Sequence, residues 1–185
     1  MLATAHASAL VGLDAHAVRV EVDVATSIPS FELVGLAETA VRESRVRVKS
    51  ALFQIGVDLA ERRVVVNLAP ADLRKHGSGF DLAIAGGVLG ALGRVPREAL
   101  EETLLLGELA LDGTLHPLRG TLPHLLGARK RTRKNGQDTR DKSEEDSVST
   151  AIKRVIVPRS NGAEAALVAA LEFGPGALEI RVADH

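Results

Sequence analysis

The sequence predicts a single α/β domain, of the α+β kind, with a mixed sheet and helices packed against it. Val18, Val20, Val22 and Val24 alternate with charged residues, a period of two that indicates a strand with one buried and one solvated face. The segment from about Phe80 to Leu92 is apolar nearly all round and predicts a buried helix. Along the chain the expected order is strands, helix, strand, helix, hairpin, helix, strand, helix and strand.

Length and composition limit the possible functions. A chain of 185 residues suits one domain that buries roughly 70% of its unfolded surface, whereas two full domains would be cramped. Apolar residues make up 45% of the chain, but there is no Trp or Tyr and only four Phe, so the core must be aliphatic. Aromatic platforms for nucleic-acid bases are therefore nearly absent, and a net charge of −1 gives the whole chain no basic footprint.

Cellular location is inferred from what the sequence lacks. There are no cysteines, which excludes disulfides, thiolate zinc sites and a cysteine nucleophile. The first residues lack the charged and apolar regions of a signal peptide, and the longest apolar run, Leu82 to Leu92, is too short to cross a bilayer. We therefore expect a cytoplasmic protein with no membrane partner.

The N-terminal third is expected to hold three strands and a helix. Alternation in Leu2–Val11, in Val18–Val24 and in Phe31–Val34 predicts an antiparallel meander. A helix is expected from about Ala37 to Ile55, before Gly56. Its predicted buried face consists of Val41, Val48, Leu52 and Ile55.

The middle of the chain is expected to continue with a strand, a helix and a hairpin. Arg62–Leu68, with three consecutive valines, predicts a central strand buried on both faces. Ser78 is the expected N-cap of the apolar helix that follows. Asp112-Gly113 predicts a hairpin between Leu104–Leu111 and Thr114–His116.

The C-terminal part alternates again between helix and strand, after an interruption. Thr121–Arg129 is expected to be helical, and the charged stretch at about 130–151 predicts a disordered insertion because it offers nothing apolar to bury. Arg154–Val157 predicts a strand, followed by a helix that Asn161 and Glu164 would cap. Alternation at Leu178, Ile180 and Val182 predicts a final strand.

The corner between the predicted strand at 62–68 and the helix at 80–92 is the most informative segment. Asn67 to Asp72 ends the strand in a proline turn, and Gly77-Ser-Gly79 opens the helix. A P-loop would need a glycine followed directly by lysine, and no glycine of this chain is followed by lysine, so the chain is not an ATPase by itself.

Nucleophilic catalysis has two candidate arrangements at this corner. His76, Ser78 and Asp81 are close in sequence, but a triad places its base on another element, so we favour an N-cap serine and a loop histidine. A pair of Ser78 with Lys75 is the remaining enzymatic alternative. The six histidines are scattered without ligand spacing, so no metal site is expected.

One side of the first predicted helix is basic. Arg42, Arg45 and Lys49 follow one another at i, i+3 and i+7 and are candidates for contact with nucleic acid or with a partner. A solvated helix flank is the alternative, supported by Glu43 four residues before Arg47.

Five segments of the chain, in this order, resemble one family. They are Val34–Ser44, Asn67–Asp72, Gly79–Leu82, Gly107–Gly113 and Pro117–Gly120. The chain resembles the N-terminal domain of the ComM/YifB family of magnesium-chelatase-like AAA+ ATPases, over nearly its whole length apart from the charged insertion. The resemblance implies a Lon-protease-like domain of the ribosomal protein S5 domain 2-like fold, spanning residues 1–185.

The resemblance also implies a larger context. In this family an AAA+ module follows the domain and holds ATP and Mg²⁺, and that module is absent from this chain, so no cofactor is expected here. Family members are expected to assemble as hexameric rings and to act as DNA helicases in branch migration during DNA uptake and recombination. Contact with DNA is therefore expected through the full-length protein.

The same resemblance bears on catalysis. In active Lon domains a serine and a lysine form the catalytic dyad, and the matching positions here hold Gly79 and Leu122, so we expect a non-catalytic scaffold. Seven residues are expected to keep the corner and the turn at residue 119 in register: Asn67, Asp72, Gly77, Gly79, Asp81, Arg119 and Gly120. Arg119 is a candidate partner for Asp72 or Asp81. A residual Ser78–Lys75 peptidase and an autonomous DNA-binding module remain the alternatives.

Overall fold

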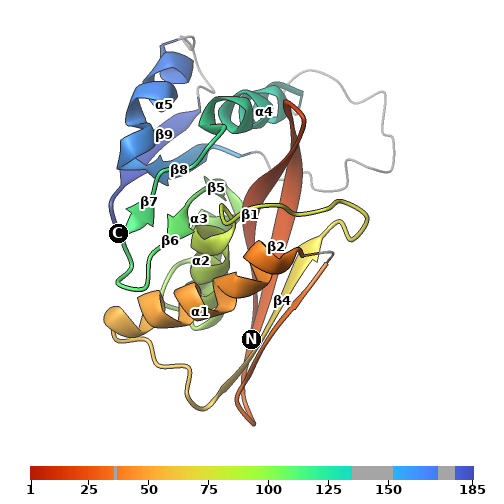
Figure 1. The fold of residues 1–185 in the computed structure, drawn as a ribbon, viewed down its shortest axis with the longest axis vertical. Helices are drawn as coiled ribbons and strands as arrows, with labels where there is room; N and C mark the ends of the chain where they lie inside the picture. Colours follow the sequence, from red (N-terminus) through yellow and green to blue (C-terminus); the bar gives the residue numbers. More distant parts are fainter. Residues whose placement is uncertain (36, 135–151, 171–177) are drawn as a thin grey trace.

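The computed structural model describes residues 1–35, 37–134, 152–170 and 178–185, and has the expected α+β architecture with a mixed sheet (Figure 1). Seven strands form the main sheet in the order β3-β4-β2-β1-β5-β8-β9, and β6 pairs with β7 in a separate hairpin. The strands are β1 (Leu2–Val11), β2 (Asp14–Thr26), β3 (Ser30–Val34), β4 (Arg62–Ala69), β5 (Thr103–Leu105), β6 (Glu108–Leu109), β7 (Leu115–His116), β8 (Arg154–Pro158) and β9 (Glu179–Ala183). The helices are α1 (Thr39–Gln54), α2 (Asp81–Ala91), α3 (Arg97–Glu101), α4 (Thr121–Lys134) and α5 (Gly162–Ala169), with a 3-10 turn, η2 (Arg159–Asn161), before α5.

One face of the sheet is covered by α1 and α2. The inward side chains of β1 and β2 are small and β-branched, with Val20 and Val22 fully buried, and they lie against α2. Gly87 permits this close approach, because a Cβ there would collide with the Val22 side chain. The predicted aliphatic core and glycine-rich buried helix are thus confirmed.

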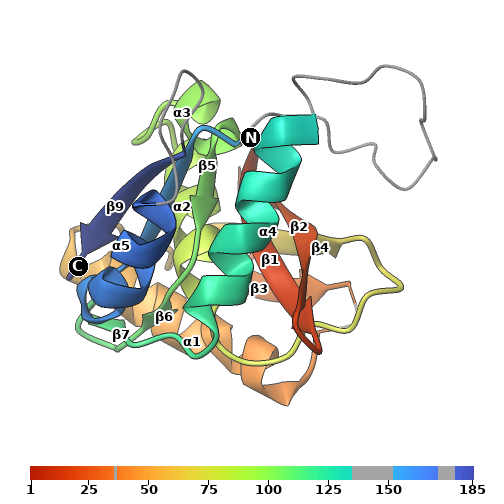
Figure 2. The same cartoon turned by 90° about the horizontal axis from the view of Figure 1, so that it is seen from above.

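The opposite face is covered by α4 over β1 and β2, and by α5 over β8 and β9 (Figure 2). Leu104, Leu125 and Val155 are fully buried in the second apolar cluster on this side. A buried hydrogen bond also ties α4 to the sheet, with Ser8 Oγ 2.6 Å from His124 Nδ1. The helix predicted at Thr121–Arg129 therefore exists and continues to Lys134, whereas most of the predicted insertion lies outside the described residues.

The predicted N-terminal meander is wrong in its third strand. β1 and β2 pair antiparallel as expected, but β3 pairs parallel with β4, which separates it from β2. Alternation in sequence specifies that Phe31–Val34 is a strand and which of its faces is apolar, but it carries no information about the neighbouring strand.

Two predicted burial patterns also need correction. β4 is flanked by strands on both edges, but only Val64, Val66 and Leu68 are buried, and the residues between them are half-buried. Ile55 was expected on the buried face of α1, yet it is 64% exposed because the helix ends at Gln54 and the chain turns away there.

The remaining elements follow the predictions with small differences. The hairpin around Asp112-Gly113 is present as β6 and β7, and Gly113 has a φ of +92°. The strand before it is shorter than expected, because it is interrupted at Gly107 between β5 and β6. The short helix α3 was not predicted, whereas β8, α5 and β9 lie where the pattern indicated.

Candidate functional site

The corner between β4 and α2 is assembled from three segments of the chain. The loop after β4 turns at Gly77, whose φ of +78° lies in the left-handed region that favours glycine. Two backbone hydrogen bonds then hold the corner against the segment before β6: Gly107 N donates to Gly79 O at 3.2 Å, and Leu82 N donates to Gly107 O at 3.1 Å. Backbone pairing therefore fixes the place where α2 begins.

Ser78 does not cap the helix. Its hydroxyl donates to the carboxylate of Glu108 on β6, while the N-cap position of α2 is Phe80 and has no side-chain cap. The prediction of an N-cap serine is therefore wrong. The competing acceptor, Glu108, lies 30 residues further along the chain, beyond the reach of local sequence rules.

Lys75 has a partner other than Ser78. Its side chain is fully buried, and its Nζ donates to the carbonyl of Pro70 in the same loop. Burial lowers the pKa of Lys75, and the nearby Asp72 opposes this in part. Because Ser78 bonds to Glu108 instead, the alternative pairing of Ser78 with Lys75 is not formed in this structure.

The three residues that suggested a triad also have separate partners. His76 Nδ1 lies 2.8 Å from Glu38 Oε2, at the N-terminal end of α1. Asp81 faces α1 and is bonded to Arg47, while Ser78 reaches Glu108. His76, Ser78 and Asp81 thus each have a different partner, Glu38, Glu108 and Arg47, and they form no triad with one another.

The position that matches a Lon nucleophile is closed by packing. A Cβ on Gly79 would lie 2.7 Å from Leu118 Cδ1, so the Leu118 side chain occupies the space that a serine side chain would need. Asn161 holds Leu118 in place, because its side chain accepts from Leu118 N and donates to Leu118 O, each at 2.8 Å. Leu122, which matches the catalytic lysine, lies on α4 and is 37% exposed.

The predicted side-chain cap of α5 by Asn161 is wrong. Asn161 is at the N-cap position, but its side chain makes no cap hydrogen bond. Its amide is used instead to pair with the backbone of Leu118, 43 residues earlier. The residue and its place at the start of the helix were predicted, but its partner was not.

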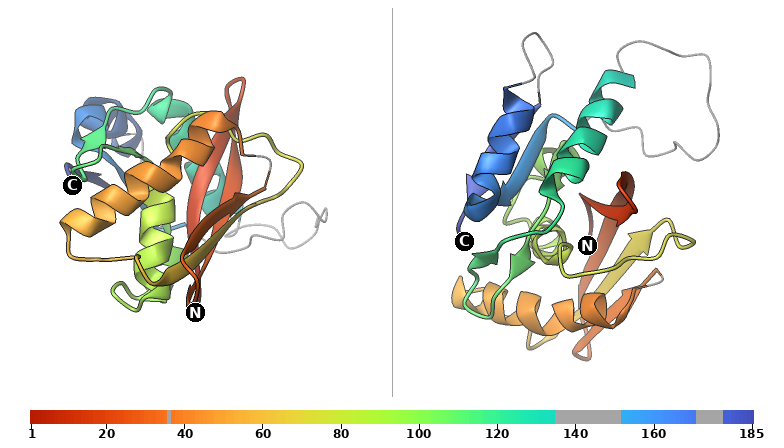
Figure 3. Two further views of the ribbon diagram at one scale, coloured as in Figure 1. Left: turned by 60° about the horizontal axis from the view of Figure 1, so that its bottom comes forward. Right: turned by 45° about the horizontal axis from the view of Figure 1, so that its top comes forward.

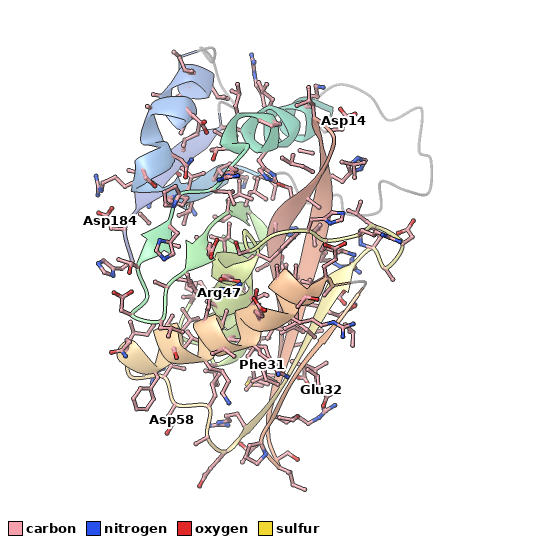
Figure 4. The ribbon with its side chains drawn as sticks, viewed as in Figure 1. Asp14, Phe31, Glu32, Arg47, Asp58 and Asp184 are labelled. Carbon is pink, nitrogen blue, oxygen red and sulfur yellow. The ribbon has the colours of Figure 1, made fainter. Side chains whose placement is uncertain are left out.

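A buried ionic cluster forms the other half of the corner. Asp81 is fully buried at the start of α2, and Arg47 of α1 reaches it through two bonds, Nε to Oδ2 at 2.6 Å and Nη2 to Oδ1 at 3.1 Å. Ser44 Oγ donates to the same carboxylate, and Leu109 N donates to Oδ2 at 3.1 Å. The hydrogen bond with Asp81 raises the pKa of Arg47, against the opposing effect of burial. This cluster joins α1, α2 and β6 (Figure 4 labels Arg47).

Sequence reasoning found Asp81 but missed its partners. Arg119 was a predicted candidate partner of Asp81, but the cation that bonds to Asp81 is Arg47. Arg119 is exposed. A signal for this arrangement was present, because Ser44 lies between Val41 and Val48 on the buried face of the helix. A polar side chain on an otherwise apolar face indicates a buried partner.

The other residues expected to be structural have the following positions. Asn67 on β4 donates from Nδ2 to Glu21 Oε2 at 2.8 Å, across the strand pair of β2 and β4. Asp72 is exposed in the loop before Lys75. Gly120 has a φ of +76° at the turn into α4. These residues thus lie in the loops and strands around the corner rather than in a single cluster.

The basic residues of α1 lie on its solvent side. Arg42, Arg45 and Lys49 are all exposed, and Arg42 Nε donates to Ala37 O at 3.1 Å. The expected ion pair of Glu43 with Arg47 is present at 4.0 Å. Arg47 is therefore shared between the surface and the buried cluster, whereas the other three cations face outward.

The part of the chain that the structure describes contains neither a cluster of metal ligands nor a membrane-spanning helix. Within 1–35, 37–134, 152–170 and 178–185, no three His, Cys, Asp or Glu side chains come together in a way that would hold a metal ion. No helix in this part of the chain combines the length and the apolar character needed to cross a bilayer.

Comparison with known proteins identifies the family. The family model described as subunit ChlI of Mg-chelatase matches residues 20–136. An uncharacterized protein of Mycobacterium tuberculosis is 44% identical over 129 residues, which cover 70% of this chain and 26% of that protein. Competence protein ComM of Haemophilus influenzae is 41% identical over 132 residues, covering 71% of this chain and 26% of ComM. YifB of Escherichia coli is 39% identical over 133 residues, covering 72% of this chain and 26% of YifB. The matched part thus spans about a quarter of the length of each relative, and the chain belongs to the ChlI family of Mg-chelatase subunits, with ComM and YifB among its relatives.

Proposed function

We propose that this chain is a non-catalytic scaffold domain of a magnesium-chelatase-like AAA+ ATPase of the ComM and YifB kind. The observation that carries the proposal is the closed corner: Gly79 leaves no nucleophile, and Leu118 fills the space beside it. Serine hydrolysis requires a hydroxyl next to a group that takes its proton. Here the hydroxyl of the adjacent residue, Ser78, donates to Glu108, and the amine of Lys75 in the same loop donates to Pro70.

The scaffold role follows from how the corner is built. Asp81 binds α1 and β6 at once, and Asn161 bonds to the backbone of Leu118 beside the corner. A cluster of this kind holds several elements in one fixed arrangement. Such rigidity suits a domain that positions other parts of a protein and performs no catalysis itself. In our proposal ATP and Mg²⁺ are bound by an AAA+ module elsewhere in the full-length protein.

The larger assembly is part of the same proposal. We expect the full-length protein to form a cytoplasmic hexameric ring and to act on DNA as a branch-migration helicase in DNA uptake and recombination. The support for this is family membership and the similarity to competence protein ComM. The domain would then pack within the ring and position the AAA+ module.

A serine-reactive fluorophosphonate probe tests the absence of catalysis. We expect no labelling of the 185-residue chain beyond that of heat-denatured protein, and no difference between wild type and Ser78→Ala. Ser27→Ala is the matched control, because Ser27 is exposed after β2, next to the start of β4 and thus at the opposite end of that strand from the corner. Labelling that is lost in Ser78→Ala but kept in Ser27→Ala would overturn the scaffold proposal in favour of a residual peptidase.

A further inference from the structure

The outward face of α1 carries an aligned stripe of cations and apolar side chains. We define the outer stripe as Arg42, Arg45, Val46, Lys49 and Phe53, which follow one another at i, i+3, i+4, i+7 and i+11. At 100° per residue these positions fall within about a third of the helix circumference and extend about 16 Å along it. Figure 3 shows α1 at the outside of the helical layer, with α2 on its inner side.

The apolar members of the stripe are unusually exposed. Val46 is 55% exposed and Phe53 is 63% exposed, although the chain has few aromatic residues. The other described phenylalanines, Phe31 and Phe80, pack in or against the core. Single exposed apolar residues need no explanation, but two that align with each other along one helix face form a contact surface.

Two cations of the stripe have no ion-pair partner among the described residues. Arg45 and Lys49 form no ion pair with any residue that the structure describes. Glu38 and Glu43 have other partners, His76 and Arg47, and Asp58 lines the same groove as Lys49 without forming an ion pair with it. The stripe therefore presents positive charge on both sides of Val46.

A groove continues the stripe at its C-terminal end. It has a volume of about 300 Å³ and lies between the last turns of α1 and the chain after Gly56, with Lys49, Phe53 and Leu59 among its lining residues. Leu59 is buried and Phe53 is exposed, so the groove offers apolar contact, and both Lys49 and Asp58 line it. An apolar side chain with a carboxylate on the Lys49 side is the complementary group.

We propose that the outer stripe is the docking surface for an acidic amphipathic helix of a partner protein. Such a helix would place leucine-like residues on Val46 and Phe53 and carboxylates opposite Arg42, Arg45 and Lys49. About three turns of helix match the length of the stripe. This deepens the proposed scaffold role, since it names the kind of partner that the scaffold holds.

Nucleic acid fits the stripe less well. Three cations neutralise few phosphates and give a weak electrostatic site. Val46, in the middle of the stripe, would lie against phosphates without gaining any favourable contact. The apolar residues thus favour a protein helix over DNA.

The test uses the 185-residue chain and a labelled synthetic probe. The probe is an 18-residue helical peptide with leucine at i, i+4, i+7 and i+11 and glutamate at most other positions, measured by fluorescence anisotropy. Its control is a peptide of identical composition with the leucines scrambled. We expect the patterned peptide to bind about tenfold more tightly than the scrambled one, because only the pattern aligns anchors with the stripe.

Variants separate the two components of the surface. Phe53→Ser and Arg45→Glu should each weaken binding of the patterned peptide by about tenfold or more. Leu13→Ser and Arg63→Glu are the matched controls: Leu13 is 85% exposed and Arg63 is a partly exposed cation, both away from the stripe. These two variants should leave the affinity unchanged.

Three results would overturn the proposal. Equal binding of the patterned and scrambled peptides would leave only non-specific attraction. Binding of a 20-nucleotide oligothymidine that is lost in Arg45→Glu but kept in Val46→Ser and Phe53→Ser would assign the stripe to nucleic acid. A concentration-dependent dimer in sedimentation that Phe53→Ser abolishes would assign it to a second copy of this chain. None of these measurements depends on probe labelling at Ser78, so the docking surface and the absence of catalysis can fail separately.

Discussion

The two faces of α1 both carry arginine, but the arginine on the inner face is bonded within the fold and the arginine on the outer face is exposed. On the inner face, Arg47 and Ser44 converge on Asp81, whose carboxylate is fully buried. On the outer face, Arg45 is exposed and forms no ion pair with the described residues. Two arginines separated by a single residue thus differ in environment, since Arg47 is largely buried against Asp81 and Arg45 is exposed.

The comparison shows that the position of a cation around the helix axis decides whether it has a structural role or is available for binding. A buried carboxylate is tolerated only where charge and hydrogen bonds compensate it, so Arg47 is committed to Asp81. An exposed cation contributes little to stability and is available to a partner. The inner face is therefore expected to control unfolding, and the outer face binding.

Replacing Arg47 is expected to have the largest effect. Arg47→Met leaves the Asp81 carboxylate buried without its cation, and we expect a loss of about 3–5 kcal/mol in the free energy of unfolding, measured in urea. Arg45→Met, two residues away, should change it by less than about 0.5 kcal/mol. Equal losses in the two variants would contradict the distinction between the faces.

Removing the hydroxyl of Ser44 is the next strongest test. Ser44 is buried and donates to Asp81, so Ser44→Ala should cost about 1.5–3 kcal/mol, the range for a hydrogen bond to a charged group. Ser50→Ala on the same helix is the control, and because alanine favours helix we expect no loss there. A neutral Ser44→Ala would mean that Arg47 and Leu109 satisfy Asp81 without the serine.

Lys75 provides a test by pH. Its folded-state pKa lies below the 10.5 of the unfolded chain, so between these two values the unfolded state binds more protons and stability rises with pH. The free energy of unfolding of wild type, relative to Lys75→Met, should therefore increase as the pH rises from the lowered folded-state pKa of Lys75 toward 10.5. A flat difference between wild type and Lys75→Met would contradict the burial of Lys75.

Most of the architecture could be predicted from periodicity. The alternating valines predicted β2, the glycine-rich apolar run predicted α2, and Asp112-Gly113 predicted the hairpin of β6 and β7. These signals are local, because side-chain direction repeats within each element. The position of β3 beside β4 could not be obtained in the same way, since strand neighbours depend on contacts far apart in sequence.

The candidate site was predicted less completely, for the same reason. The absence of a nucleophile at Gly79 was predicted from the family resemblance, but Leu118 as the side chain that lies beside Gly79 was not. Ser78 and Asn161 were assigned to helix caps, the commonest local use of such residues. Both bond instead to groups at least 30 residues away, Glu108 and Leu118.

The smallest expected effect lies at the boundary between the two faces. Glu43 is 65% exposed and reaches Arg47 Nη1 at 4.0 Å, so Glu43→Gln removes only an i, i+4 pair of about 0.3–0.5 kcal/mol. Because the pair is solvated, the loss should vanish when unfolding is measured in about 1 M salt, where the screening length falls to about 3 Å. The effect of Arg47→Met should persist in the same salt, since the Asp81 carboxylate is shielded from solvent ions. If salt abolished both effects, Arg47 would belong to the outer face, and the distinction between a structural and a binding side of α1 would have to be abandoned.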